Sequence, residues 1–146
     1  MIETKTTETL VAICGFVGII ASAVTEILGG YDVYLEHLIL FMILDFLAGL
    51  IIALFGKSDK SVSGKISSQA MLEGFGKKIL IIFVVVVAEG VDTILSINYL
   101  RNLLIYAFIA YESTSIIEHA VAMGLPKSLG KYKEIIENLF EVNSKK

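Results

Sequence analysis

The chain has 146 residues, a formal net charge of −3, 55 % hydrophobic residues and a mean hydropathy of +0.78. This length fits one small domain, and a charge so close to neutral gives no reason to expect a nucleic-acid partner. So much apolar material is unusual for a small soluble domain. Composition therefore predicts a membrane protein.

Four apolar runs predict four membrane-spanning helices. The runs cover residues 10–28, 34–55, 79–97 and 100–120. Each is close to the ~20 residues that a helix needs to cross the hydrocarbon core, and none alternates as a barrel strand does. The second run is the clearest, whereas Arg101, Glu112 and Glu118 interrupt the fourth. Short turns at 29–33 and 96–99 predict an all-α integral membrane protein whose four helices form two hairpins.

The first run is predicted to remain in the mature chain. Its start, MIETKTTET, carries one lysine against two glutamates, and no Ala-x-Ala-like site follows residue 28. A cleaved signal peptide has a basic start and a shorter apolar region. Thr7 or Thr9 is instead placed to cap the first turn of a spanning helix.

The lysines predict the orientation. Segments 56–78 and 124–146 hold five lysines each, and Lys5 precedes the first run. Eleven of the twelve basic residues therefore fall on one side if all four runs span. Under the positive-inside rule both termini are cytoplasmic, in a single membrane domain covering residues 1–146.

Two segments on that side have predicted structure of their own. The loop 56–78 is rich in Ser, Gly and Lys and is expected to be solvated, with a short interfacial helix around 66–75. In the tail 124–146, apolar residues recur at helical spacing and predict a short amphipathic helix. These residues are Tyr132, Ile135, Ile136, Leu139 and Phe140. The helix is expected to lie on the membrane surface, and pairing with a second copy is the alternative.

Ionisable residues inside the spans are the candidates for intramembrane function: Asp45, Glu89, Asp92, Arg101 and Glu112. A charge at this depth is costly and usually faces a bundle interior or water. Threading the second hairpin places Asp92 level with Arg101, so these two are expected to pair. No basic partner is expected at the depth of the other three acids, which leaves protonation, water or a neighbouring helix.

Small residues supply candidates for helix packing or oligomerisation: Gly15, Gly18, Ser22, Gly49 and Ala53. Gly18 and Ser22 lie in a stripe with a four-residue period on the first span, and Gly49-x-x-x-Ala53 allows close helix approach on the second. Two interpretations stay open. The small residues pack the monomer's own bundle, or they form contacts between subunits whose acids face a wet interior.

Enzyme motifs are absent from the sequence, so no catalytic residue, cofactor or metal site is predicted. EGFGKK at 73–78 follows no predicted strand and lacks the ending of a phosphate loop. Cys14, the single cysteine, fits a small packing residue. His37 and His119 are expected near opposite membrane surfaces, where they cannot share a metal. His119 is expected to be a solvated helix end.

Four motifs follow one another over residues 10–140. LGGYD precedes the second span, and LDFLAG contains Asp-aromatic-x-Ala-Gly. SSQAMLEGFGKKILI and AYESTSIIEHAVAMGLPKSLGKYKEIIENL come next. In this order they resemble the toxin-secretion/phage-lysis holins, small membrane proteins of phages and prophages in mainly Gram-positive bacteria. Ala48, Tyr111, Ser113 and His119 depart from the family pattern, so its hydrogen bonds near Asp45 and Glu112 are not carried over.

The resemblance implies a timed hole-former in the bacterial cytoplasmic membrane. Such subunits form a homo-oligomer that permeabilises the bilayer, so that an endolysin, or in some relatives a toxin, leaves and the host cell lyses. An antiholin is a further candidate partner. Two other classes stay open. One is a small cation- or proton-coupled transporter with Glu89, Asp92 and Glu112 as relay groups, and the other is a scaffold that holds a partner with its tail.

Overall fold

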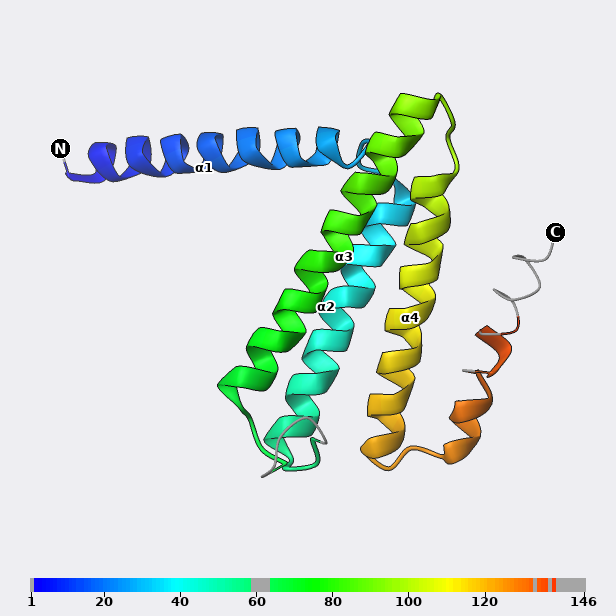
Figure 1. Cartoon of the computed structure of the whole chain (residues 1–146). Helices are drawn as coiled ribbons and strands as arrows, with labels where there is room; N and C mark the ends of the chain where they lie inside the picture. Colours follow the sequence, from blue (N-terminus) through cyan, green and yellow to red (C-terminus); the bar gives the residue numbers. More distant parts are fainter. Residues whose placement is uncertain (1, 59–63, 133, 137, 139–146) are drawn as a thin grey trace. The chain divides into compact units, whose positions relative to one another are not determined.

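The computed structural model describes residues 2–58, 64–132, 134–136 and 138, and within them every regular element is a helix. The elements are α1 (Ile2–Ile27), α2 (Val33–Leu54), α3 (Ser68–Leu95), α4 (Leu100–Ala122) and the short 3-10 helix η1 (Lys127–Leu129) (Figure 1). The all-α prediction is confirmed. The chain divides into two units, residues 1–32 and residues 33–146.

The first unit consists of the single helix α1 and the turn that ends it. Gly29 and Gly30 have φ angles of 81° and 96°, a backbone conformation that glycine adopts without steric cost. Their N–H groups donate to the carbonyl oxygens of Glu26 and Thr25, which caps the last turn of the helix. A lone helix has no neighbour within its unit, so its apolar side chains belong to no core there.

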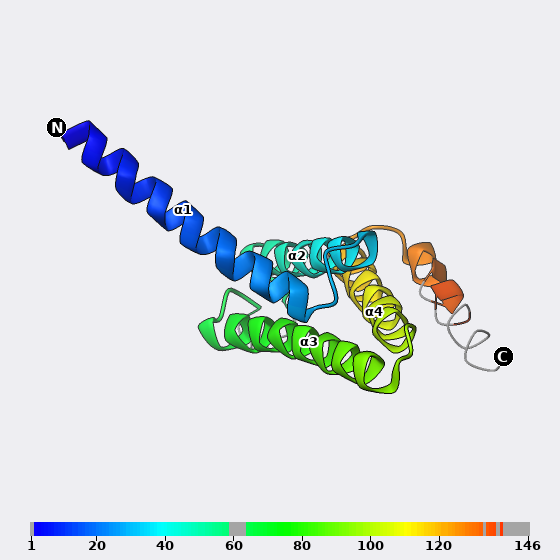
Figure 2. The same cartoon turned by 90° about the horizontal axis from the view of Figure 1, so that it is seen from above.

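The second unit is a bundle of three helices. α4 packs against both α2 and α3, whereas α2 and α3 touch each other only sparsely (Figure 2). α2 and α4 run in the same direction and α3 runs opposite to them (Figure 1). The buried apolar side chains between them are Leu35, Leu38, Met42, Ile52, Ile81, Val85, Ala88 and Ile105. Tyr34 and Tyr106 add an edge-to-face ring contact between α2 and α4, with centroids 5.2 Å apart.

The turn between α3 and α4 is closed by Asp92. Its carboxylate accepts hydrogen bonds from the backbone N–H groups of Leu100 at 3.1 Å and Arg101 at 2.9 Å. These N–H groups have no partner inside α4, so a side chain from the preceding helix caps them. Ser96 ends α3 in the left-handed conformation, with φ 53°. The predicted short turn at 96–99 therefore lies between two packed, antiparallel helices.

α3 begins well before the predicted third span. Ser67 caps it by accepting a hydrogen bond from the N–H of Ala70 at 3.5 Å, and the helix continues without a break to Leu95. The prediction of a separate interfacial helix around 66–75 is wrong, because residues 68–75 form the first turns of α3. Lys78, assigned by the sequence to a solvated loop, is a helical residue inside the bundle.

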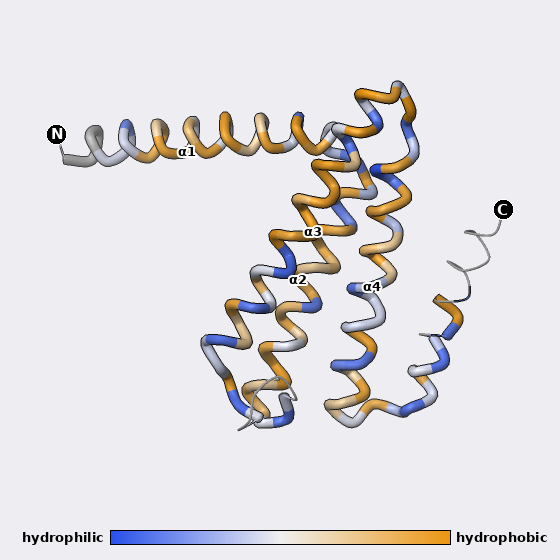
Figure 3. Tube along the Cα trace, viewed as in Figure 1, coloured by the Kyte–Doolittle hydropathy of each residue, from blue (hydrophilic) through white to orange (hydrophobic). Residues whose placement is uncertain are grey.

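Two of the described helices are long and apolar enough to cross a membrane, by length and composition: Thr6–Ile27 within α1, and α2. α3 and α4 have 28 and 23 residues, which at about 1.5 Å per residue exceed the ~30 Å of hydrocarbon. Figure 3 shows that hydrophilic residues interrupt both helices, especially toward the end of the bundle that holds the 64–67 segment. Four spans therefore stay a prediction.

The tail after η1 is helical at 130–132 and 134–136. Tyr132 and Ile135 are exposed there, as on the predicted amphipathic helix. Leu139 and Phe140, which complete its predicted apolar face, lie outside the described residues.

Candidate functional site

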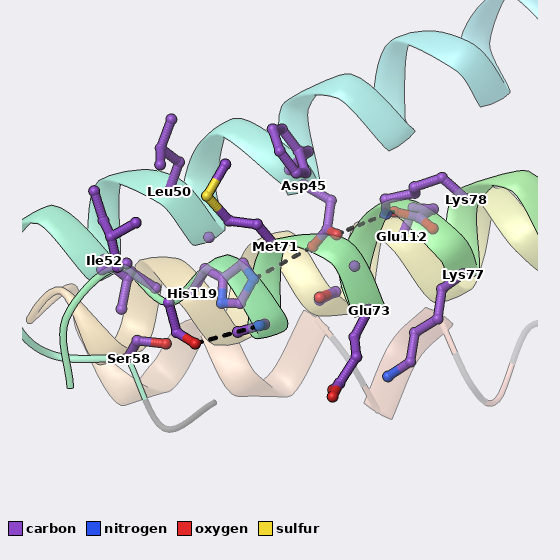
Figure 4. Close-up of a pocket in the computed structure, with 18 of the residues that line it drawn as sticks. Asp45, Leu50, Ile52, Ser58, Met71, Glu73, Lys77, Lys78, Glu112 and His119 are labelled. Carbon is purple, nitrogen blue, oxygen red and sulfur yellow. Dashed lines mark hydrogen bonds and ion pairs between the residues drawn. The ribbon is translucent and has the colours of Figure 1, made fainter. Parts of the chain in front are cut away.

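Four ionisable side chains from three helices meet inside the second unit (Figure 4). Lys78 of α3 donates hydrogen bonds to Asp45 Oδ2 of α2 at 2.7 Å and to Glu112 Oε2 of α4. Nε2 of His119, also on α4, lies 3.5 Å from Asp45 Oδ1. The Glu112 side chain is fully buried, and the other three are 12–14 % exposed. These four residues are called the buried charge cluster below.

The helix geometry explains why these residues meet. Asp45 and Glu112 each lie twelve residues after the first residue of their helix, and because α2 and α4 are parallel neighbours they reach the same level. His119 follows Glu112 by seven residues, about two turns, and so shares its face. Gly49 follows Asp45 by one turn. A Cβ atom on Gly49 would lie 3.4 Å from His119 Nε2, in ordinary van der Waals contact, so the imidazole packs directly against this position.

The cluster corrects two expectations about charge. Asp45 and Glu112 were expected to lack a basic partner, and Lys78 contacts both. His119 was expected to be solvated, and its side chain is 13 % exposed beside Asp45. Burying a charge is costly unless it is paired and hydrogen-bonded, so an ammonium between two carboxylates is what makes these acids tolerable inside the bundle.

A second polar group lies near the α3–α4 turn. Arg101, whose side chain is 6 % exposed, places Nε 3.8 Å from Glu89 Oε2 and donates a hydrogen bond to Asn102 Oδ1 at 3.0 Å. Asp92 meets Arg101 through the backbone N–H described above. The structure thus joins Asp92 to the backbone of Arg101, and a pair between the Asp92 carboxylate and the Arg101 guanidinium stays a prediction. It also gives Glu89 a basic neighbour, which was not expected.

A cavity of about 250 Å³ adjoins the buried charge cluster. Asp45, Glu112, Ser115 and His119 line it, together with the exposed Lys77. Asp45 Oδ1 and Glu112 Oε1 are buried and accept no hydrogen bond from the described residues. Within that part of the chain, no three His, Cys, Asp or Glu side chains are grouped to hold a metal ion. The arrangement can therefore bind protons, water or hydrogen-bond donors.

The small residues divide between the two units. Gly49 faces His119 of the same chain and Ala53 lines the cavity, and the packing or oligomerisation role of both stays a prediction. On α1, a Cβ atom at Gly15 or Gly18 would meet nothing within 4 Å, and Ser22 is exposed. Contacts between subunits through α1 stay a prediction.

Lys78 and His119 are the site residues that sequence reasoning missed. Ser67 followed by helix-forming residues signals an early helix start, which would have carried Lys78 into the bundle. The seven-residue spacing of Glu112 and His119 signals a shared face. His119 is also one of the departures from the family pattern, and in this chain it faces Asp45.

Comparison with known proteins places most of the chain in one family. The model of the bacteriophage holin family matches residues 22–141. An uncharacterized 14.9 kDa protein in the nagH 3′ region of Clostridium perfringens is 34 % identical over 124 residues, or 84 % of this chain and 86 % of that protein. An uncharacterized protein of Listeria monocytogenes is 31 % identical over 112 residues, or 76 % of this chain and 71 % of that protein. No solved structure matches the chain.

Proposed function

The chain belongs to the bacteriophage holin family, and from that premise we propose that it permeabilises the bacterial cytoplasmic membrane as a homo-oligomer. Permeabilisation releases an endolysin, or a toxin in its place, and leads to lysis of the host cell. Family membership carries this proposal. The two membrane-capable helices support it, because a hole-former of this size needs apolar helices to enter the bilayer.

In this proposal all four long helices span the membrane, with both termini cytoplasmic, in one multi-pass domain. The lengths of α3 and α4 support it, and so does the way their charges are held. Lys78, Glu112 and Arg101 contact groups of opposite charge inside the bundle. Intramembrane charges are tolerated when they face the bundle interior and pair with one another.

We assign the two units different roles in this process. In dispersed subunits the buried charge cluster holds α2, α3 and α4 together, and Lys78 is a polar bridge from α3 to α2, two helices that otherwise touch each other sparsely. α1, with the open positions Gly15 and Gly18, contacts neighbouring subunits. Above a critical density the bundle rearranges so that polar faces line a water-filled lesion. The charged groups that had been sheltered then gain hydration.

A lysis time course in bacteria tests the proposal. The chain is expressed with and without a muralytic enzyme, and membrane potential and release of a cytoplasmic enzyme are followed together. A holin gives an abrupt loss of potential, and then lysis that depends on the muralytic enzyme. Graded, selective ion flux without lysis would contradict the proposal and support a cation transporter. A chain that changes neither the membrane potential nor the release of the cytoplasmic enzyme would be a scaffold.

A further inference from the structure

Lys78 is the one base that contacts both acids of the buried charge cluster. Asp45 and Glu112 supply two carboxylates, whereas Lys78 supplies one ammonium. Because both carboxylates contact the same Nζ atom, the contacting oxygens lie within ~6 Å of each other, two hydrogen-bond lengths. Two carboxylates this close, in a site sheltered from water, resist being ionised at the same time. The cluster reaches neutrality when it takes up one proton.

The surroundings of the two acids decide which one takes the proton. Both oxygens of Asp45 face basic groups, because Oδ2 contacts Lys78 at 2.7 Å and Oδ1 lies 3.5 Å from His119 Nε2. Glu112 shares Lys78 through Oε2. Its Oε1 and Asp45 Oδ1 are both buried and accept no hydrogen bond from the described residues, but only the Asp45 oxygen has the imidazole of His119 beside it. Its side chain is 0 % exposed, against 12 % for Asp45. A neutral acid costs much less to bury than a charge with one oxygen unsatisfied.

We infer that the buried charge cluster is a proton-binding site in which Glu112 holds one proton as a neutral carboxylic acid while the bundle is folded. Lys78 and Asp45 then form a balanced ion pair beside it. The other titratable groups around the cavity are Lys65, Glu73, Lys77 and Tyr111. All four are exposed and so are screened by solvent. The cavity of about 250 Å³ has room for several water molecules that exchange the proton.

The inference predicts how stability depends on pH. An exposed glutamate in the unfolded chain releases its proton near pH ~4.3. Above that pH the folded chain binds one proton more than the unfolded chain, so stability is complete at low pH and falls as pH rises. The equilibrium constant for unfolding increases about tenfold per pH unit through this one group.

Infrared spectroscopy of the purified full-length chain in detergent micelles tests the assignment directly. At neutral pH the wild type is expected to show the C=O stretching band of a protonated carboxylic acid, and Glu112→Gln is expected to lose it. Glu118→Gln removes an exposed glutamate from the same helix and is expected to keep the band. Absence of the band from the wild type, or its survival in Glu112→Gln, would overturn the inference.

Unfolding in mixed micelles across a pH series supplies a second reading. Glutamine has the shape of the neutral acid, so Glu112→Gln is expected to fold. The free energy of unfolding of this variant is expected to lose the part of the wild-type pH dependence that comes from binding one proton. If His119→Gln removes that dependence and Glu112→Gln does not, the proton belongs to His119 and the inference is wrong. Neither measurement uses permeabilisation, so the inference stands or falls separately from the proposed function.

Discussion

The two units of this chain handle apolar surface in opposite ways. α1 is one helix whose apolar side chains have no core within its unit, so groups outside that unit must cover them. α2, α3 and α4 bury apolar residues against one another and enclose paired charges. The contrast teaches that high hydropathy alone does not distinguish a helix made for lipid or partner contact from one made for a bundle. The buried charges make that distinction.

The largest effect that separates the units is expected from Lys78→Met. The substitution leaves at least one buried carboxylate without its cation, which costs about 3–5 kcal/mol of unfolding free energy in the second unit. Unfolding in micelles measures the loss, and expression with an endolysin should show earlier lysis or reduced accumulation. The matched control is Lys77→Met, which removes an exposed lysine next to it and should change stability by less than about 0.5 kcal/mol. If both substitutions changed the stability equally, Lys78 would not be the bridge between the helices.

A smaller, opposite effect on timing is expected from Asp45→Asn. Lys78 can still donate its hydrogen bond to Glu112 in this variant, so the bundle remains closed. The open lesion, however, no longer gains the hydration of one carboxylate, which on insertion scales is worth about 2–3 kcal/mol. Lysis should be delayed while membrane insertion is unchanged, as followed by culture turbidity and by membrane fractionation. If Asp45→Asn lysed cells at the wild-type time, Asp45 would have no role in the opening of the lesion.

Placing a leucine side chain in each unit tests directly whether the two units have different roles. Gly49→Leu overfills the space beside His119 and should destabilise the second unit by about 1–3 kcal/mol. Gly18→Leu meets open space, so folding should change by less than about 0.5 kcal/mol, while cross-linking between subunits should fall. Unfolding and chemical cross-linking of both variants give the comparison. Unchanged cross-linking in Gly18→Leu would place the subunit contact elsewhere.

The smallest effects are expected at the turns that end α1 and α3. Both use a residue with positive φ, glycine in the first case and Ser96 in the second. Gly30→Ala should therefore cost about 1 kcal/mol, and Ser96→Gly should gain up to about 1 kcal/mol by relieving the left-handed serine. The midpoint temperatures of thermal unfolding of the two variants should shift in opposite directions from that of the wild type. A shift in the same direction would show that the backbone conformation is not what limits these turns.

Several parts of the fold and site could be predicted from local patterns. The helical class followed from apolar runs, the ends of α1 and α3 from Gly29–Gly30 and Ser96–Tyr99, and the meeting of Asp92 with Arg101 from their distance to a short turn. Each of these depends on residues close together in the chain. The cluster of Asp45, Lys78 and Glu112 joins positions more than thirty residues apart. No local pattern reports which face of α3 a lysine side chain will reach.

By itself, the sequence determined that the chain is helical, rich in apolar surface and divided by short turns, because hydrophobic length and turn chemistry are local properties. It also carried the motifs through which the family is recognised. Only the tertiary structure decided that Lys78 bridges two acids, that His119 turns inward against Gly49, and that Glu112 keeps a buried oxygen that accepts no hydrogen bond from the described residues. These facts depend on the level and direction at which three helices pack, and a residue's charge acquires its role from the groups that packing places around it.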